Sequence, residues 1–441
     1  MFYLKLIFVV CFINYVKSIK DSNNYEKCLF KDYTNNIYNR KFGICINKTF
    51  IFDESGILKN KTSFNIKNNK SNYYITKNSQ NIVKQKKLKK YNFKNNIFNY
   101  LKDFFDCEIK EKTIIIFEPN RYHHECIPGY AKYFTDLGYN VDTLIIKKTE
   151  DSLLLFHPKE KLRIFLFDNL KQIEKNIKKI KNKFKKYDYI FINSTDKNKK
   201  EIYKNLGVFD FYNSIFVAHD INFIKRIVMD NLFNENKIIT LGKFKKGVQV
   251  NPHYFGNYVL RNKNNKTKFF VTSTINRDYK YLINSVEILK NEGLNFEIVV
   301  IGRCKNFNSN IVPENIKNYF IFRHNISYSQ MYSEIKYSDY VIITLNPKNK
   351  DNIIFKNLRI TGSSQLVYGF LKPAIIHKEY AELYNMTNKN SFIYNKNFTD
   401  VMREAINFNN KQYNEMRDNL KSLSNKIYKL SFENLKKIMK I

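Results

Sequence analysis

The stretch Arg359–Ile376, RITGSSQLVYGFLKPAII, gives the main indication of the fold of this chain. A Gly-Ser-Ser turn at 362–364 opens a short helical segment, and Lys372-Pro373 leads from that segment directly into an apolar strand. The first turn of a helix has unpaired backbone N–H groups and carries the positive end of the helix dipole, so it suits a phosphate. An ordinary helix N-cap is the alternative interpretation of the same residues.

Apolar runs recur on both sides of this stretch, and amphipathic segments separate most of them. Unbroken apolar runs are typical of parallel strands that are buried on both faces. They cover residues 113–117, 141–146, 187–192, 215–218 and 238–241, and later 269–273, 296–301, 319–322, 340–345 and 374–376. The alternation predicts an α/β chain with two tandem Rossmann-like, doubly wound domains facing a cleft, and ligands at the carboxyl ends of the strands.

Changes of composition along the chain predict the domain boundaries. Residues 19–110 are rich in Asn, Lys and Tyr without a strong period, and we expect an N-terminal extension there. The first Rossmann-like domain is predicted over 111–250 and an interdomain linker over 251–268. The second Rossmann-like domain is predicted over 269–425, and a C-terminal helix over 426–441.

The first 18 residues carry an apolar run, Leu6–Val16, behind the single lysine Lys5. This run is short for a bilayer span but fits the apolar region of a signal peptide. A short membrane anchor and a buried first strand are the alternatives. We therefore expect the secretory pathway or a membrane if the signal is genuine, and the cytoplasm otherwise.

The composition is globular and strongly basic. The 441 residues include 38 Phe and 32 Tyr, and their net charge is +36. Lysine and asparagine are spread over the whole chain, and no nucleic-acid-binding motif accompanies the charge, so we predict no nucleic-acid partner. Nucleotide substrates and an anionic membrane surface are the partners that such a charge favours. No Cys-x-x-Cys pair occurs, which argues against a structural zinc site.

The order and spacing of these segments resemble the GT-B glycosyltransferases of the group-1, family-4-like type over roughly residues 111–425. Arg277 and Lys280, which follow the strand end Thr272-Ser273, resemble the basic pair that meets the donor diphosphate in that family. The turn Gly362, Ser363 and Ser364 resembles its glycine-rich, phosphate-facing turn. The resemblance implies a nucleotide-sugar donor and a glycan, lipid or protein acceptor, with no further cofactor.

The resemblance also implies a nucleotide site. Gly302 and Arg303 end the segment Val-Ile-Gly-Arg, which is similar to the family's glycine turn beside the nucleotide. His324 begins a passage that resembles the one placing the base. Typical members carry two glutamates seven residues apart near the glycine-rich turn, but this chain has no carboxylate between Asp351 and Glu379. Gln365 or its neighbour occupies the second position, and an amide bonds ribose without charge assistance.

Two segments of the first half complete the predicted site. The loop 121–129, RYHHECIPG, follows the first apolar strand, and in the family this loop meets the acceptor and the donor phosphates. Its candidates are His124, Glu125 and Gly129, although a capped loop with exposed histidines fits as well. Pro128 stands where a helical zinc motif would need histidine, so no metal is expected. His219, directly after the strand 215–218, is the candidate that meets the donor sugar, and a structural histidine is the alternative.

The resemblance implies transfer with retention at the anomeric carbon, with the diphosphate charge neutralised by basic side chains and backbone N–H groups instead of a metal. Two other functions stay open. A non-catalytic nucleotide-sugar or carbohydrate-binding relative is suggested by the missing glutamates. A sugar-nucleotide epimerase of the same architecture would need a carboxylate pair, for which Glu118 and Asp220 are the candidates.

Overall fold

The computed structural model describes residues 98–147, 150–153, 161–195, 199–222, 235–244, 246–273, 277, 279–302 and 307–441, together with four short N-terminal strands. The chain divides into two compact units, residues 1–93 and 94–441. In the first unit, β1 (Leu29–Lys31) pairs with β2 (Phe42–Ile44), and β3 (Ile66–Asn68) pairs with β4 (Ser71–Tyr73), both antiparallel. The predicted signal segment 1–18 lies outside the described residues.

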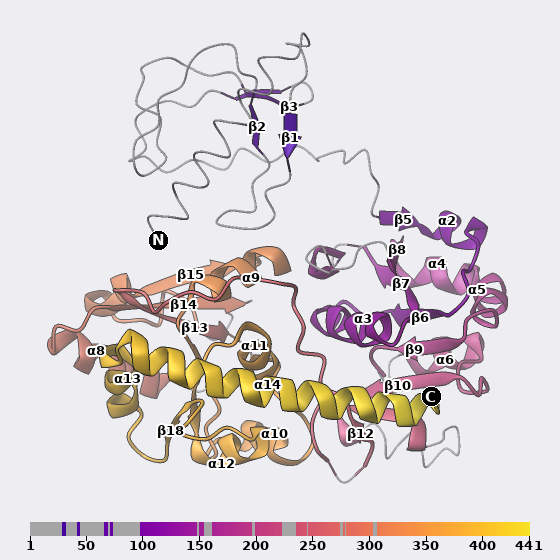
Figure 1. Cartoon of the computed structure of the whole chain (residues 1–441). Helices are drawn as coiled ribbons and strands as arrows, with labels where there is room; N and C mark the ends of the chain where they lie inside the picture. The colour runs from indigo at the N-terminus through magenta and orange to yellow at the C-terminus, as the bar shows by residue number, and fades with distance from the viewer. Residues whose placement is uncertain are drawn as a thin grey trace. The chain divides into compact units, whose positions relative to one another are not determined.

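An eight-stranded parallel sheet forms the first domain of the second unit (Figure 1). Its spatial order is β12-β11-β10-β9-β6-β7-β8-β5. The strands are β5 (Phe98–Tyr100), β6 (Thr113–Glu118), β7 (Asn140–Ile146), β8 (Leu162–Phe167), β9 (Tyr189–Ile192), β10 (Ser214–Ala218), β11 (Ile238–Thr240) and β12 (Val248–Gln249). The chain builds outward from β6 in one direction and then from β9 in the other, so a topological switch point lies between these two strands.

Helices cover this sheet because both of its faces are apolar. Along β6, Ile114 and Ile116 enter one core cluster, whereas Ile115 and Phe117 enter another. Successive strand residues point to opposite faces, so a run without polar interruption needs cover on both sides. The covering helices are α2 (Leu101–Asp106), α3 (Ile127–Asp136), α4 (Leu170–Lys175), α5 (Ile177–Phe184) and α6 (Lys200–Leu206), with 3-10 turns η1 (His124–Cys126), η2 (Glu150–Leu153) and η5 (Glu235–Lys237).

A six-stranded parallel sheet forms the second domain, in the order β15-β14-β13-β16-β17-β18. Its strands are β13 (Thr267–Ser273), β14 (Phe296–Gly302), β15 (Phe320–His324), β16 (Tyr340–Ile342), β17 (Ala374–His377) and β18 (Phe392–Tyr394). The order reverses between β13 and β16, which gives this domain a switch point of its own.

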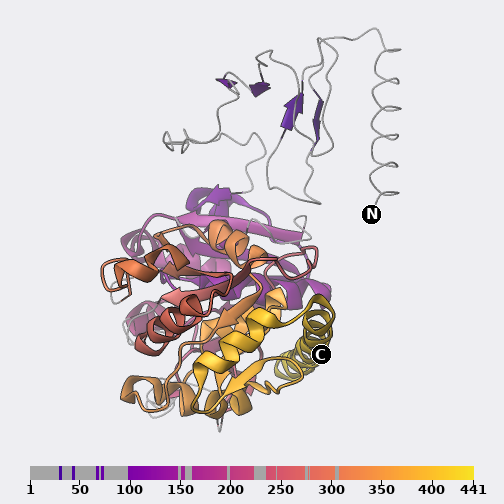
Figure 2. The same ribbon diagram turned by 90° about the vertical axis from the view of Figure 1, so that its left-hand side faces the viewer.

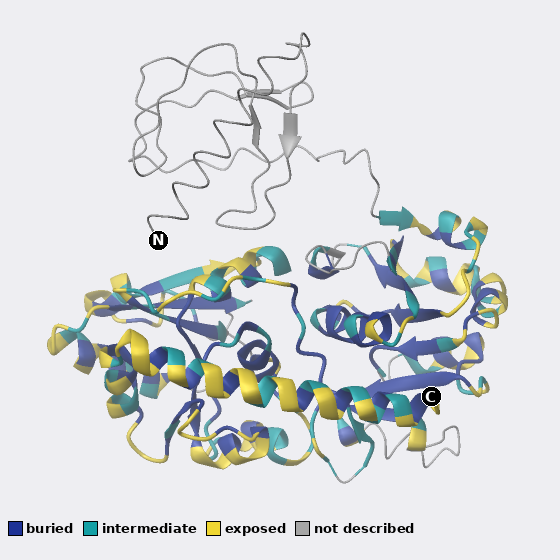
Figure 3. Cartoon of the chain, viewed as in Figure 1, coloured by how far each residue is buried: buried dark blue, intermediate teal, exposed yellow. Residues whose placement is uncertain are grey.

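The helices of the second domain surround these strands, as the end-on view in Figure 2 shows. They are α8 (Lys280–Asn291), α9 (Tyr328–Tyr337), α10 (Ile354–Asn357), α11 (Gly362–Phe370), α12 (Lys378–Ala381) and α13 (Phe398–Asn407), with 3-10 turns η6 (Glu314–Tyr319), η7 (Lys350–Asn352) and η8 (Glu382–Tyr384). Buried residues are concentrated in the two sheets (Figure 3). The predicted fold, α/β with two Rossmann-like domains, is confirmed.

Two connections join the domains. The helix α14 (Asn410–Met439) packs Leu420 in the core of the second domain and Leu435 in that of the first. The segment 250–256 is the other connection and is largely buried. Two glycines let this segment approach α3 and α11 closely. A methyl group on Gly129 of α3 would lie 2.5 Å from the Pro252 carbonyl carbon, and one on Gly369 of α11 would lie 2.5 Å from the His253 carbonyl oxygen.

Several expected boundaries differ from the structure. The first domain begins at β5, whereas residues 98–110 were expected in the N-terminal extension. The helix α14 runs without a break across the predicted boundary at residue 425. The strands β8 and β18 were not among the predicted runs. The start of the predicted linker is part of the core because Gly129 and Gly369 let it pack between the domains.

In the part of the chain that the structure describes, no helix combines the length and the apolar character that crossing a bilayer requires.

Candidate active site

A buried carboxylate occupies the switch point of the first sheet. Glu118 ends β6 with no exposed surface, and its Oε1 accepts hydrogen bonds from the Asn120 backbone N–H (2.8 Å) and the Ser194 hydroxyl (2.7 Å). Its Oε2 accepts from Asn193 Nδ2 at 2.7 Å. Burial raises the pKa of Glu118 to about 7, although these donors act in the opposite direction. The network ties the loop after β6 to the residues after β9.

Two histidine rings stack beside this network. His123 has a left-handed backbone (φ 66°), and its carbonyl oxygen accepts a hydrogen bond from Asn193 Nδ2 at 2.9 Å. Its ring lies on that of His219, with centroids 3.6 Å apart and planes inclined by 9°. His219 Nε2 is 2.9 Å from the Asn193 carbonyl oxygen. A carbonyl only accepts, so Nε2 carries the proton and the neutral ring has Nδ1 as its acceptor.

The two rings have different electrostatic surroundings. Burial lowers the pKa of His219 well below its ordinary value, and the neighbouring His123 lowers it further. For His123, burial also disfavours the charged form, but the Glu125 carboxylate, 3.7 Å away, outweighs it and the pKa of His123 is raised. Burial opposes the charge of Glu125 as well, yet His123 holds the pKa of Glu125 down at about 2. The stack therefore pairs a ring whose charged form is favoured by Glu125 with a ring whose neutral form is favoured by burial.

Contacts between the two domains connect this cluster to the second domain. Tyr328, the first residue of α9, donates its hydroxyl to Glu125 Oε2 at 3.1 Å. Arg359, just ahead of α11, binds Asp220 Oδ2 through Nη2 at 2.7 Å and through Nε at 3.0 Å. Glu125 lies in η1, in the loop after β6, and Asp220 follows His219 after β10, so both contacts reach segments beyond the carboxyl ends of first-domain strands. The carboxyl ends of the two sheets thus face one another.

The glycine-rich turn lies at the carboxyl end of β13 in the second domain. As predicted, a helix begins at Gly362, with Thr361 as its N-cap residue. The Ser363 hydroxyl lies 2.8 Å from Thr272 Oγ1 at the end of β13, which joins the turn to the switch point of the second sheet. A methyl group placed on Gly362 would meet nothing within 4 Å, so the space in front of this residue is open.

Arg277 lies beside the same helix N-terminus. Its Nη1 donates to Asn352 Oδ1 at 3.0 Å and its Nη2 to Thr361 Oγ1 at 3.4 Å. The guanidinium also stacks on the Phe355 ring, 4.5 Å from the centroid. Burial lowers the pKa of Arg277 from its ordinary value, and several tyrosines oppose that effect. An arginine remains charged through such a shift, so a partly buried cation is positioned at the start of α11.

Other predicted residues of the donor side lie at strand and helix ends. Lys280 begins α8 and is exposed. Gly302 ends β14 with a φ of 144° that glycine tolerates. His324 ends β15, and its exposed ring lies parallel to the Phe322 ring with centroids 6.1 Å apart. Arg303 falls outside the described residues.

Four residues that were predicted to contact a substrate have partners within the protein instead. The His124 ring is fully buried, with Nε2 2.6 Å from the Asn120 carbonyl oxygen, because the left-handed turn at His123 directs it inward. At Gly129 the Pro252 backbone occupies the position expected for a substrate. The Ser364 backbone N–H, which was expected to meet the phosphates, donates to the Thr361 carbonyl oxygen at 3.1 Å, and the buried Ser364 hydroxyl donates to the same oxygen. Gln365 is also buried and accepts a weak hydrogen bond from Cys126 Sγ at 3.8 Å, a contact between the domains.

Three participants in this arrangement were not predicted from the sequence. His123 was quoted within its loop but not chosen, and the adjacent pair of histidines was the available signal. Asn193 and Tyr328 act through contacts 70 and 203 residues away in sequence, and no local pattern indicates such pairs. Among the residues that the structure describes, no three His, Cys, Asp or Glu side chains are grouped so that they could hold a metal ion.

Comparisons with known proteins agree on the architecture. No protein-family model matches the chain, and no curated protein matches its sequence. The crystal structure of TarM matches with a TM-score of 0.51 at 9% identity, covering 76% of this chain and 99% of TarM. A glycosyltransferase from Rickettsia africae matches with 17% identity, 75% and 98% coverage and a TM-score of 0.44. A putative UDP-N-acetylglucosamine 2-epimerase from Listeria monocytogenes matches with 9% identity, 70% and 91% coverage and a TM-score of 0.39. The likeness to TarM, at this low identity, shows the fold alone, which is the GT-B arrangement of two Rossmann-like domains.

Proposed function

We propose that the protein is a glycosyltransferase that moves a sugar from a nucleotide-sugar donor to a glycan, lipid or protein acceptor. The observation that carries this proposal is the position of Arg277 at the N-terminus of α11, beside the open space in front of Gly362. A fixed cation and the backbone N–H groups of a helix N-terminus at one point suit a diphosphate. The stacked histidines follow strand ends of the other domain, and we propose that the sugar and its acceptor meet beside them.

The proposed chemistry needs the charge of the departing nucleotide diphosphate to be stabilised. Arg277 and the first N–H groups of α11 would supply this stabilisation from fixed positions, with Lys280 as a further cation. No step of this scheme requires a metal, and the resemblance implies retention at the anomeric carbon. The protein supplies positioning and electrostatics on the donor side.

The proposed sugar contact is His219. Its Nε2 proton is committed to the Asn193 carbonyl oxygen, so Nδ1 can accept a hydrogen bond from a sugar hydroxyl. The low pKa of His219 keeps this acceptor unprotonated at neutral pH. Glu125 and Tyr328 hold the underlying His123 ring in place, and His123 in turn supports the His219 ring from one face.

A nucleotide titration tests the donor site. A ligand that binds only the folded state raises the melting midpoint by mass action, so UDP, GDP, ADP and CMP with their sugars can be compared by thermal shift. We expect one nucleotide class to shift wild type and to lose its effect in Arg277→Gln. Lys290→Gln, in the last turn of the helix that Lys280 begins, is the matched control and should behave as wild type. The absence of a shift with every nucleotide would remove the basis of the proposal.

One observation favours a non-catalytic nucleotide-binding relative as the second candidate. Gln365, the residue at the expected ribose-binding position, is turned toward Cys126 instead of the open end of α11. Such a protein would bind a nucleotide without releasing it from a sugar nucleotide over any acceptor. An assay for the released nucleoside diphosphate separates the two candidates.

The geometry does not support the epimerase alternative. Glu118 is enclosed by its Asn and Ser donors, whereas Asp220 forms an ion pair with Arg359, so these two carboxylates have separate partners. An epimerase would interconvert the sugar nucleotide without an acceptor, and chromatography of the incubated donor would detect the second epimer.

A further inference from the structure

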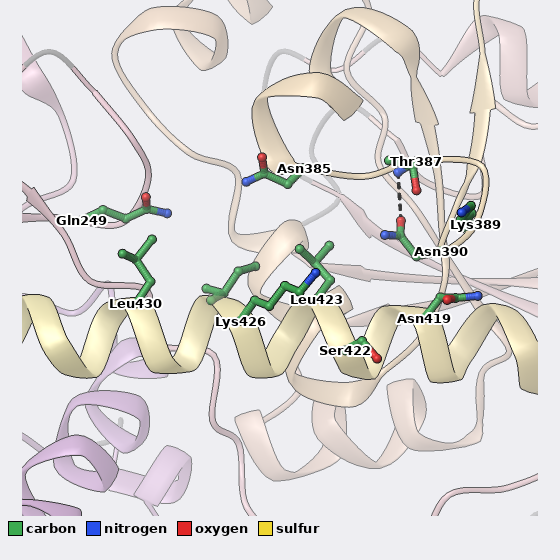
Figure 4. Close-up of a pocket in the computed structure, with 11 residues that line it drawn as sticks. Gln249, Asn385, Thr387, Lys389, Asn390, Asn419, Ser422, Leu423, Lys426 and Leu430 are labelled. Atoms are coloured by element: carbon green, nitrogen blue, oxygen red, sulfur yellow. Dashed lines mark hydrogen bonds between the residues drawn. The ribbon is translucent and has the colours of Figure 1, made fainter.

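A second recess, which shares no residue with the candidate active site, lies where the two domains are joined. This pocket of about 460 Å³ has walls from both domains and from α14 (Figure 4). Gln249, at the end of β12, belongs to the first domain, and the loop 385–390 ahead of β18 belongs to the second. Residues from 419 to 430 of α14 form the remaining wall. We call this recess the hinge pocket.

Hydrogen bonds fix the walls of the hinge pocket. In the loop, Asn390 Oδ1 accepts the Thr387 backbone N–H at 3.0 Å, and the Thr387 carbonyl oxygen accepts the Asn390 N–H at 2.9 Å. Asn385 has a left-handed backbone (φ 54°), which turns the chain into this loop. On the other side, Asn434 Nδ2 of α14 donates to the Gln249 carbonyl oxygen at 2.9 Å. A ligand would therefore meet a preformed site.

The lining chemistry favours an anion that carries hydroxyl groups. Lys389 and Lys426 contribute two ammonium groups, and none of the described residues that line the pocket is acidic. The amides there can both donate and accept hydrogen bonds, and the hydroxyls can accept them, as a polyol requires, although the Ser422 hydroxyl already donates to the Asp418 carbonyl oxygen at 3.1 Å. They belong to Gln249, Asn385, Thr387, Asn390, Asn419 and Ser422.

The apolar part of the lining is aliphatic. Leu423 and Leu430 project from α14 on the same side as Lys426 (Figure 4). An aliphatic surface suits the apolar face of a pyranose ring. No aromatic residue is among the described residues that line the pocket, so a nucleobase would find no ring to stack on. The volume lies within the range of about 300–1,000 Å³ that is usual for small-ligand sites.

We propose that the hinge pocket binds a small anionic saccharide of one or two sugar units. This site is separate from the donor cleft and does not depend on the proposed transfer reaction. Its ligand touches both domains and α14 at once.

Titration calorimetry on the full chain tests this proposal with glucose 6-phosphate and glucuronate as anionic sugars, and with glucose and inorganic phosphate as their neutral and sugar-free counterparts. The decisive variant is the double substitution Lys389→Ala/Lys426→Ala. Lys421→Ala/Lys429→Ala is the matched control, because it removes the same charge from exposed positions of α14 outside the pocket. Melting curves confirm that both variants fold.

We expect at least one anionic sugar to bind more tightly than glucose and inorganic phosphate, and to weaken about tenfold or more in the pocket variant only, as loss of charge-assisted hydrogen bonds requires. Whether phosphate or carboxylate is the preferred anion follows from the comparison of the two anionic sugars.

An equal loss of affinity in both double variants would mean that only the general positive charge acts, and would overturn the proposal. Binding of inorganic phosphate as tight as that of glucose 6-phosphate would exclude a saccharide site. Absence of binding by both anionic sugars would also reject it. None of these results depends on the Arg277 titration, so the two proposals can fail separately.

Discussion

His123 and His219, 96 positions apart in the sequence, stack with ring centroids 3.6 Å apart and nearly parallel planes. The partners of the two rings give them opposite protonation behaviour. Glu125 favours the imidazolium of His123, whereas burial and the charge of His123 favour the neutral His219. A chain that only needed a packed aromatic pair would not require the Glu125 carboxylate, so we interpret this pair as part of the site.

This arrangement predicts two separate histidine titrations. In protein labelled with 15N-histidine, His123 should titrate above the ordinary value of 6.5 and His219 below it, with assignments from single His→Gln variants. Glu125→Gln should lower the pKa of His123 because it removes the carboxylate charge. Titration of both rings near 6.5 would contradict the assigned roles.

The buried Glu118 should make the free energy of unfolding fall as the pH rises. Its pKa is about 7 in the folded state against an ordinary 4.5, so its contribution is complete below pH 4.5 and is lost as the pH passes 7. Two and a half pH units correspond to about 3 kcal/mol at most. Denaturant curves should therefore show Glu118→Gln gaining stability relative to wild type between pH 4.5 and 8. A difference that does not change with pH would argue against a buried carboxyl group there.

His253 should make the free energy of unfolding rise with pH, which is opposite to the effect of Glu118. Burial lowers its pKa to about 4, so the neutral ring contributes stability that is complete above pH 6.5 and is lost as the pH falls toward 4. The expected loss is up to about 1.4 kcal/mol per pH unit in that window. In His253→Gln this part of the pH dependence should be absent. Urea denaturation of wild type and variant at pH 7 and pH 5 measures this dependence. The same change in unfolding free energy in both proteins would refute the prediction.

Two glycines of α11 should respond differently to the same substitution. Gly369→Ala places a methyl group 2.5 Å from the His253 carbonyl oxygen and into the Phe255 ring, so we expect a loss of about 1–3 kcal/mol in unfolding free energy. Gly362→Ala meets no neighbouring atom and should leave thermal stability unchanged or slightly higher. Its methyl group enters the open space beside Arg277 and should weaken nucleotide binding. Equal melting temperatures for the two variants would contradict the packing described for the connection 250–256.

Arg277→Lys should not substitute for arginine. A single ammonium group cannot reproduce the planar guanidinium that bonds Asn352 and Thr361 and stacks on Phe355. We expect about tenfold weaker binding of the nucleotide that shifts wild type, measured by calorimetry, which corresponds to about 1.4 kcal/mol. Wild-type affinity in this variant would mean that a point charge suffices and that the planar guanidinium is not required.

The sequence predicted the architecture well because buried parallel strands have a local signature. The runs 113–117 and 296–301 needed no knowledge of their neighbours to be recognised as strands. The strand β8 was missed, and its run contains Arg163, whose side chain bonds the buried Asp142 of β7 at 2.7 Å. That partner lies 21 residues away, so the apolar pattern alone does not explain a charged residue inside a strand.

The site was predicted less completely, and for physical reasons. The helix start at Gly362 is a local feature and lies at the predicted position. The choice between His123 and His124 depended on a left-handed backbone at a non-glycine residue, which sequence patterns do not reveal. The contacts of Glu125 with Tyr328 and of Gln365 with Cys126 depend on how the two domains face each other.

The path of α14 has a consequence for how the protein is made. The core of the first domain includes Leu435, Ile438 and Met439, which leave the ribosome only after the whole second domain has been synthesised. Domains usually fold in the order of their synthesis. Here the first domain waits for its last core residues, and the part of its core around Val250 that they complete remains exposed. A nascent chain stalled before residue 435 should therefore depend on chaperones more than the finished protein does.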